Sequence, residues 1–235
     1  MRHLRLTLIA LIAVAVSLAV WLTPPAPPTP RPALACLTPA LAPAIRADPA
    51  TFDAHYAACR DEVLTLLGDA SDAEGALMFA SLVAHQLAPY GLSLAYELDV
   101  LLAEPQLDCD NYAWLTMLLW RESAHAEGRV RMVVWEHPAL GVHAQVVADF
   151  PDGRALLLDP TTNMVARVSL AEAFGGRGVA SEAIILLPDR NAALGARPHY
   201  VAALQLGMLT PDHLILLSDD PTPQMEETAR LYANP

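Results

Sequence analysis

Three residues of this sequence, Cys109, His143 and Asp159, are of the types that together make a thiol nucleophilic. A cysteine attacks a carbonyl carbon as its thiolate, which is favoured where the residue begins a helix beside an imidazolium. A carboxylate can hold that imidazole in the required tautomer and orientation. The three residues follow one another at separations of 34 (143 minus 109) and 16 (159 minus 143), and they predict a Cys-His-Asp site for acyl chemistry.

The element that must present Cys109 is a helix. Residues 109–123 carry apolar side chains on nearly every side, which predicts a buried central helix. Asp108 directly precedes this stretch and is a favoured N-cap residue. Cys109 is therefore expected in the first turn of the helix.

A predicted hairpin carries the other two residues. Strands are expected over 130–135, 142–150 and 155–158, with a tight turn at Pro151-Asp152-Gly153 between the last two. His143 would then face position 160 or 161, so Asp159 lies one or two residues from direct opposition. A bulge or twist would bring the two side chains onto one face.

Further patterns predict an α+β chain with a helical N-terminal half. The expected helices run from Asp48-Pro49 to about Leu67, from a capping box of Ser71 and Glu74 to about Leu87, and from a capping box of Ser169 and Glu172 to Gly175-Gly176. Residues 183–187 and 214–217 are candidate additional strands.

Each of the three reactive residues also has a structural interpretation. A lone cysteine is usually a small buried hydrophobe, and a histidine in an apolar strand is often a hydrogen-bonded core residue. Asp159 precedes Pro160, as aspartates at strand ends often do. Their order, and their placement at a helix start, in a strand and at a strand end, favour the chemical interpretation.

Three blocks of this sequence resemble those of the transglutaminase-like superfamily, over roughly residues 92–168. The blocks are Asp108-Cys109-Asp110-Asn111-Tyr112-Ala113, Val142-His143-Ala144 and Leu158-Asp159-Pro160-Thr161. The resemblance implies a papain-like core in which a buried, cysteine-bearing helix packs on an antiparallel sheet. It also implies that Cys109 is the nucleophile, His143 the general base and acid, and Asp159 the residue that orients the imidazole.

The sequence departs from the family pattern at two places. Family members usually have glycine shortly before the cysteine and an aromatic residue two positions after the histidine, where this chain has Leu107-Asp108 and Gln145. An oxyanion hole would need the backbone N–H of Cys109 and one further donor. Gln106 is a candidate for that donor.

The charge and composition exclude several classes of partner. The net charge is -12, and all 14 basic residues are arginine, without a basic cluster, so nucleic acid is not an expected partner. The sequence has no C-x-x-C zinc pattern, and we expect neither a metal nor another cofactor. An alternative interpretation places calcium at the cluster of Asp108, Asp110 and Asn111.

The N-terminal region has the pattern of an export signal. Arg2, His3 and Arg5 precede an apolar run over residues 6–22, so residues 1–23 are expected to be a signal-anchor that crosses the cytoplasmic membrane. An alternative is cleavage and secretion, because Ala33-Leu34-Ala35 fits a signal-peptidase site. Either way, the positive-inside rule places the following chain outside the cytoplasm, in the cell envelope of a bacterium.

The expected domain organisation follows from this. Residues 24–46 form a Pro-rich linker, 47–218 the transglutaminase-like domain and 219–235 an acidic C-terminal tail. Three cysteines leave one unpaired if a disulfide forms, and Cys36 with Cys59 is the candidate pair, with Cys109 free.

Two functional hypotheses follow. The first is a membrane-anchored cysteine hydrolase, either a peptidase or an amidase, or an acyl transferase that works through a Cys109 thioester on a protein or peptide substrate. The alternative, motivated by the two departures, is a catalytically inactive transglutaminase-like module for binding or assembly in the envelope.

Overall fold

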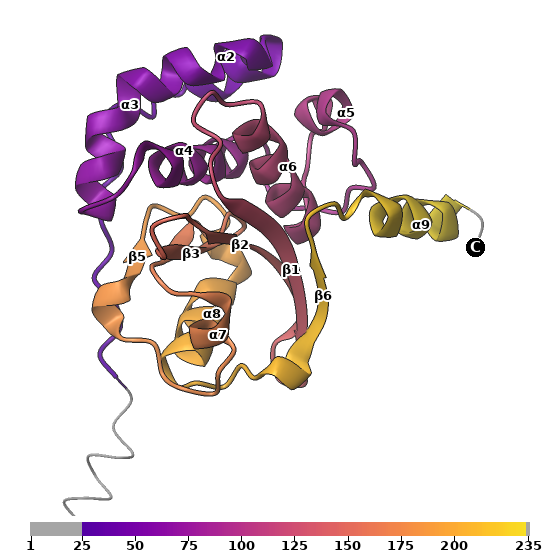
Figure 1. The fold of residues 1–235 in the computed structure, drawn as a ribbon. Helices are drawn as coiled ribbons and strands as arrows, with labels where there is room; N and C mark the ends of the chain where they lie inside the picture. The colour runs from indigo at the N-terminus through magenta and orange to yellow at the C-terminus, as the bar shows by residue number, and fades with distance from the viewer. Residues whose placement is uncertain (1–24, 234–235) are drawn as a thin grey trace, which may run out of the picture.

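The computed structural model describes residues 25–233 and shows an α+β fold built on one six-stranded sheet (Figure 1). The strand order is β5-β4-β3-β2-β1-β6, and every neighbouring pair is antiparallel. The strands are β1 (Arg129–His137), β2 (Gly141–Asp149), β3 (Ala155–Asp159), β4 (Met164–Ala166), β5 (Ile184–Leu186) and β6 (Leu214–Ser218). The antiparallel sheet predicted from the sequence is therefore confirmed.

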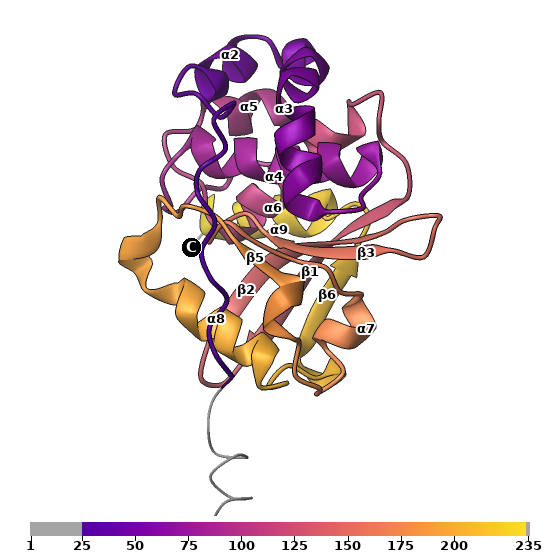
Figure 2. The same cartoon turned by 90° about the vertical axis from the view of Figure 1, so that its left-hand side faces the viewer.

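Helices cover both faces of this sheet (Figure 2). They are α2 (Leu41–Ala47), α3 (Phe52–Leu67), α4 (Asp72–Leu87), α5 (Leu98–Ala103), α6 (Cys109–Arg121), α7 (Leu170–Ala173), α8 (Ala196–Gln205) and α9 (Thr222–Ala233). In Figure 1, α2, α3, α4 and α6 lie above the sheet, and α7 and α8 lie below it. The central strand β2 is buried between these two layers, as a strand covered on both faces must be.

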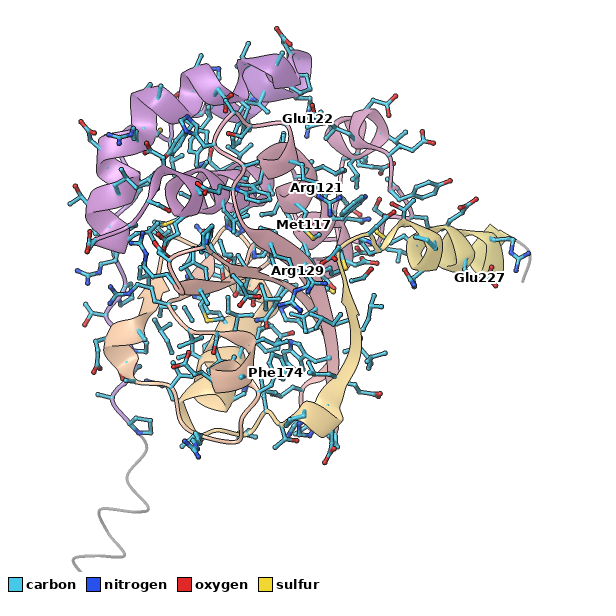
Figure 3. The ribbon with its side chains drawn as sticks, viewed as in Figure 1. Met117, Arg121, Glu122, Arg129, Phe174 and Glu227 are labelled. Carbon is cyan, nitrogen blue, oxygen red and sulfur yellow. A yellow bond between two sulfur atoms is a disulfide. The ribbon has the colours of Figure 1, made fainter. Side chains whose placement is uncertain are left out.

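The alternation of side chains along the strands gives each layer its own core. Met132 and Val146 point toward α4 and α6, whereas Val133 and Val147 point toward the opposite layer. Phe174, at the end of α7, fills the second core and is labelled in Figure 3. Because successive residues serve different cores, a shift of register by one position would exchange the two sets.

Helix α6 begins where its capping residues predict. The Asp108 carboxylate accepts a hydrogen bond from the Asn111 N–H at 3.2 Å, and the Asn111 side chain accepts one from the Asp108 N–H at 3.2 Å. This reciprocal arrangement is a capping box, and it places Cys109 at the first helical position. The predicted N-cap is confirmed.

The Pro-rich linker predicted over residues 24–46 is not a free spacer. The Arg31 N–H donates to the Leu186 carbonyl at 2.7 Å, so this segment pairs with the outer edge of β5 (Figure 2). Leu41 and Ile45 of α2 are buried in the core. The prediction failed because proline removes a donor only at its own position, and the residues between and after the prolines still pair and pack.

The acidic tail predicted over residues 219–235 is also ordered in its described part. Residues 222–233 form α9, in which Met225 is buried. Asp219 anchors the turn before α9, because Arg129 donates to its carboxylate at 3.0 and 3.1 Å and Arg121 donates to its carbonyl. Both arginines are labelled in Figure 3. Asp219, the first residue of the predicted acidic tail, thus binds these two arginines.

Residues 1–24 lie outside the part of the chain that the structure describes, and so does the predicted signal-anchor. Among residues 25–233, no helix is both long enough and apolar enough to cross a bilayer.

A disulfide joins Cys36 to Cys59 of α3, the pair considered from the sequence. It ties the segment before α2 to the helical layer across a sequence separation of 23 residues. Closing a loop of that length stabilises a folded chain by about 3 kcal/mol in the chain-entropy account. Replacing both cysteines by serine is therefore expected to lower the free energy of unfolding by that order, as measured in urea. Adding reductant to the wild type should reproduce the loss, and reductant should not affect the double variant.

Candidate active site

Cys109 lies at the N-terminus of α6 and is partly exposed. It is the free cysteine of the chain, because Cys36 and Cys59 are bonded to each other. It opens onto a groove of about 380 Å³. The other residues that line the groove are Tyr90, Leu92, Asp108, Asp110, Val134, Val142 and Ala144. The thiol is therefore the nucleophilic group that a molecule in this groove would meet.

His143 lies on β2 between two of the groove residues but is itself 2% exposed. Its Nε2 atom is 2.9 Å from Oδ2 of Asp159. Its ring stacks on Tyr200 of α8, with centroids 4.2 Å apart, and meets the ring of Trp135 edge-on. The imidazole is thus fixed on three sides. Since Nε2 faces Asp159, Nδ1 is the ring nitrogen left for the Cys109 thiol.

Asp159 ends β3 and is fully buried. Its Oδ1 accepts from the Thr162 N–H at 3.1 Å, in addition to the contact of Oδ2 with His143. The pairing of Val146 with Leu158 sets the register of the hairpin, and continuing that register puts His143 opposite Thr161. This agrees with the offset predicted from the turn. The side chains of His143 and Asp159 share a face because they are an even number of positions apart across the ladder.

The electrostatics favour a charged pair. Burial alone would lower the pKa of His143, but the charge and hydrogen bond of Asp159, with a smaller contribution from the nearby Cys109 side chain, raise the pKa to about 10. For Asp159, burial acts to raise the pKa, and the charge and hydrogen bond of His143 outweigh it, so the pKa lies below its ordinary value. At neutral pH the pair is an imidazolium held by a carboxylate.

This pair makes stability depend on pH in a defined direction. The pKa of His143 rises from an ordinary value of about 6.5 in the unfolded chain to about 10 in the fold. The stabilisation is therefore fully present below about pH 6.5 and is lost as the pH rises toward 10. We expect the advantage of wild type over Asp159→Asn in urea unfolding to shrink between pH 6.5 and pH 10. An advantage that stays constant or grows over this range would contradict the charged pair. Carrying Cys109→Ser in both proteins keeps the thiol out of the comparison.

Gln145, at the position where the transglutaminase-like pattern has an aromatic residue, contacts both Trp135 and Asp159. Its Oε1 accepts from the Trp135 indole N–H at 3.0 Å, and its Nε2 donates to Oδ2 of Asp159 at 3.3 Å. The sequence pattern marks Gln145 only as a departure. The signal that was available is a polar residue in the middle of a buried strand, which must find hydrogen-bond partners.

Gln106, the candidate oxyanion donor, lies elsewhere. Its side chain packs over Gly91, and it is not among the described residues that line the groove. Tyr90 occupies the groove instead, because the Leu107 N–H donates to the Pro89 carbonyl and the Gly91 N–H to the Leu107 carbonyl. Burial, followed by the negative charges of Cys109, Asp108 and Asp110, raises the pKa of Tyr90 to about 12. Its hydroxyl therefore stays protonated at neutral pH.

The cluster considered for calcium is used for capping. The Asp108 carboxylate accepts from the Asn111 N–H, and the Asn111 amide donates to the Ala95 carbonyl at 2.7 Å. Burial and the adjacent Asp110 carboxyl raise the pKa of Asp108 to about 8. Over residues 25–233, no group of three or more His, Cys, Asp or Glu side chains is arranged to hold a metal ion.

Comparisons with protein-family models, with curated proteins and with solved structures find no match to this chain.

Proposed function

We propose that this protein is an extracytoplasmic cysteine hydrolase or acyl transferase with a transglutaminase-like core, acting on amide bonds of protein or peptide substrates. The observation that carries the proposal is the buried His143–Asp159 pair beside an accessible cysteine at a helix N-terminus. Residues 6–22 would anchor the protein in the cytoplasmic membrane, and the chemistry needs no cofactor.

The proposed reaction has two steps. The Cys109 thiolate attacks the carbonyl carbon of the substrate, and the tetrahedral intermediate collapses as the C–N bond breaks and the His143 imidazolium gives its proton to the leaving amine. The acyl group is then a thioester on Cys109. Water or a second amine attacks the thioester, His143 takes a proton from the attacking group, and the thiolate leaves. The product is an acid or a new amide, respectively.

The oxyanion of the intermediate needs donors near Cys109. The Cys109 N–H is at the first turn of α6 and has no hydrogen-bond partner in the described part of the chain, so it is free to donate. The Tyr90 hydroxyl likewise has no partner among the described residues, and its ring lines the same groove. Tyr90 would therefore replace Gln106 as the second donor.

Replacing Tyr90 by phenylalanine is expected to lower kcat by roughly 10²- to 10³-fold, with a smaller change in KM, because an oxyanion donor acts mainly in the transition state. Steady-state kinetics on a peptide amide would measure this. Gln106→Leu is the matched control and should keep near wild-type kcat. A Tyr90→Phe enzyme with unchanged kcat would remove Tyr90 from the mechanism.

Acyl-enzyme formation tests the proposed function directly. The full-length protein is mixed with 4-nitrophenyl butyrate, and intact mass and peptide mapping locate any butyryl group. A burst of nitrophenolate and a butyryl adduct on Cys109 that hydroxylamine removes are expected, with both reduced at least about tenfold in His143→Gln. Equal acylation of wild type and His143→Gln would defeat the proposal, since it would show only an exposed thiol.

One observation favours the alternative, an inactive binding or assembly module. His143 is 2% exposed, Tyr200 stacks on its ring, and neither His143 nor Asp159 is among the described residues that line the groove. A histidine that a leaving amine cannot reach would have only a structural role in the core. On that hypothesis, iodoacetamide alkylates Cys109 in the folded protein no faster than in the protein unfolded in urea. The catalytic hypothesis expects faster alkylation in the fold near neutral pH.

A further inference from the structure

A second cavity, of about 710 Å³, lies away from the Cys109 groove and shares no lining residue with it. Its walls come from the segment before α2, from α2, from the C-terminal turn of α4 and from the segment after β5, elements that meet in Figure 2. Most of the wall is apolar, with Leu34, Leu37, Leu82, Leu87, Leu187 and Pro188 among its residues. Its volume falls within the range of roughly 300–1,000 Å³ that small-molecule sites in proteins occupy.

Two arginines lie on the wall of this cavity. Arg46 donates to the Leu87 carbonyl at 2.7 Å, and Arg190 donates to the Gln86 carbonyl. These carbonyls are consecutive at the C-terminal end of α4, so the two guanidinium groups are held near one another. Each uses one N–H in this way and has further donors left.

The charge of these two arginines is not balanced by a carboxylate. In the described part of the chain, neither Arg46 nor Arg190 forms an ion pair. The carboxylate of Asp189, which also lines the cavity, accepts from the Asn191 N–H at 2.8 Å and lies 3.8 Å from Arg197. Capping the end of α4 accounts for one donor of each arginine. Both arginines are exposed, so the donors that do not cap α4 are accessible to a ligand in the cavity.

We propose that this cavity binds an anionic amphiphile with a single alkyl chain, of which a fatty acid is the simplest case. The carboxylate would lie between Arg46 and Arg190, where it reduces the repulsion between the two guanidinium groups and uses their remaining donors. The alkyl chain would lie along the leucine wall, where burial of apolar surface favours binding. A carboxylate and a phosphate monoester share the required head-group chemistry.

The disulfide helps to build this cavity. Leu34 and Leu37 lie on either side of Cys36, which is bonded to Cys59 of α3. The bond therefore helps to hold Leu34 and Leu37 in the wall, together with the pairing of Arg31 with Leu186. Binding of the amphiphile should accordingly weaken when Cys36 and Cys59 are both replaced by serine.

Calorimetric titration of the full-length chain, purified without ionic detergent, tests the proposal with four probes: dodecanoate, dodecyl phosphate, dodecanol and inorganic phosphate. Dodecanoate and dodecyl phosphate are expected to bind one to one, and at least about tenfold more tightly than dodecanol or phosphate alone. Arg46→Gln with Arg190→Gln should weaken dodecanoate binding at least about tenfold, whereas the exposed Arg177→Gln should not change it. The double variant Arg46→Lys, Arg190→Lys keeps both positive charges and should keep most of the affinity for dodecanoate. It is the second test if the double Gln variant is unstable.

The other outcomes overturn the proposal. Dodecanol that binds as tightly as dodecanoate would show that the arginines only cap α4. Inorganic phosphate that binds as tightly as dodecyl phosphate would assign the arginines to a free anion, without a role for the apolar wall. Dodecanoate that binds the Gln and Lys variants equally would also reject a site built on their charge.

Discussion

Replacing Cys109 by alanine is expected to abolish the thioester and to lower amide hydrolysis by at least about 10³-fold, because the nucleophile is removed while the binding groove remains. The groove walls come from other residues, including Tyr90, Val134 and Val142, so KM should change much less than kcat. Kinetics on a peptide amide, together with intact mass after reaction with an activated ester, would measure both effects. The free energy of unfolding should change little, because Cys109 is only partly buried.

Cys109→Ser is a second variant for this prediction. Serine keeps the size and the polar group but forms its anion far less readily than cysteine, so its activity should also fall strongly. The Cys36→Ser, Cys59→Ser double variant should keep its rate constant for acylation wherever it remains folded. Full hydrolytic activity in Cys109→Ala would place the reactive centre elsewhere.

Replacing Asp159 by asparagine is expected to lower kcat by roughly 10³- to 10⁴-fold, the order seen when the carboxylate of a nucleophilic triad becomes an amide. The amide cannot compensate an imidazolium, so burial would lower the pKa of His143 and leave it neutral at pH 7. The thiolate would then lose its counter-charge. The rate of iodoacetamide alkylation at pH 6 should fall in the same variant, which a purely structural role of Asp159 would not predict.

Two matched variants separate this effect from a general loss of packing. Asp149→Asn makes the same change from carboxylate to amide, but on β2, where Asp149 is half-exposed and pairs with Arg131. It should leave kcat near the wild-type value. Gln145→Leu removes one of the donors to the Asp159 carboxylate and should have an intermediate effect. Equal kcat in Asp159→Asn and Asp149→Asn would contradict the role proposed for Asp159.

Features with local causes could be predicted from the sequence. The N-cap at Asp108 and the capping boxes at Ser71 and Ser169 depend on residues three positions apart, and the structure has all three. The hairpin that carries His143 and Asp159 was predictable because the tight turn at Pro151-Asp152-Gly153 fixes its register.

Features made by distant residues were not predictable in this way. Strand β4 has three residues, too few for a periodic pattern, and it is stabilised by β3 and β5 on either side. Tyr90 reaches the groove through pairing with Leu107, and nothing in the sequence near Tyr90 indicates this pairing. Tyr200 covers His143 from α8, an element with little helical signal of its own. In each case tertiary packing decides the structure.

The pairing of the N-terminal segment with the edge of β5 affects the order in which parts of the chain fold. Arg31 bonds to Leu186, which follows it by 155 residues (186 minus 31), so the segment has no partner until most of the protein has been synthesised. During synthesis, the residues around Arg31 therefore pair only after the sheet has formed. Residues 25–31 reach their final position on the edge of β5 only when the fold is nearly complete.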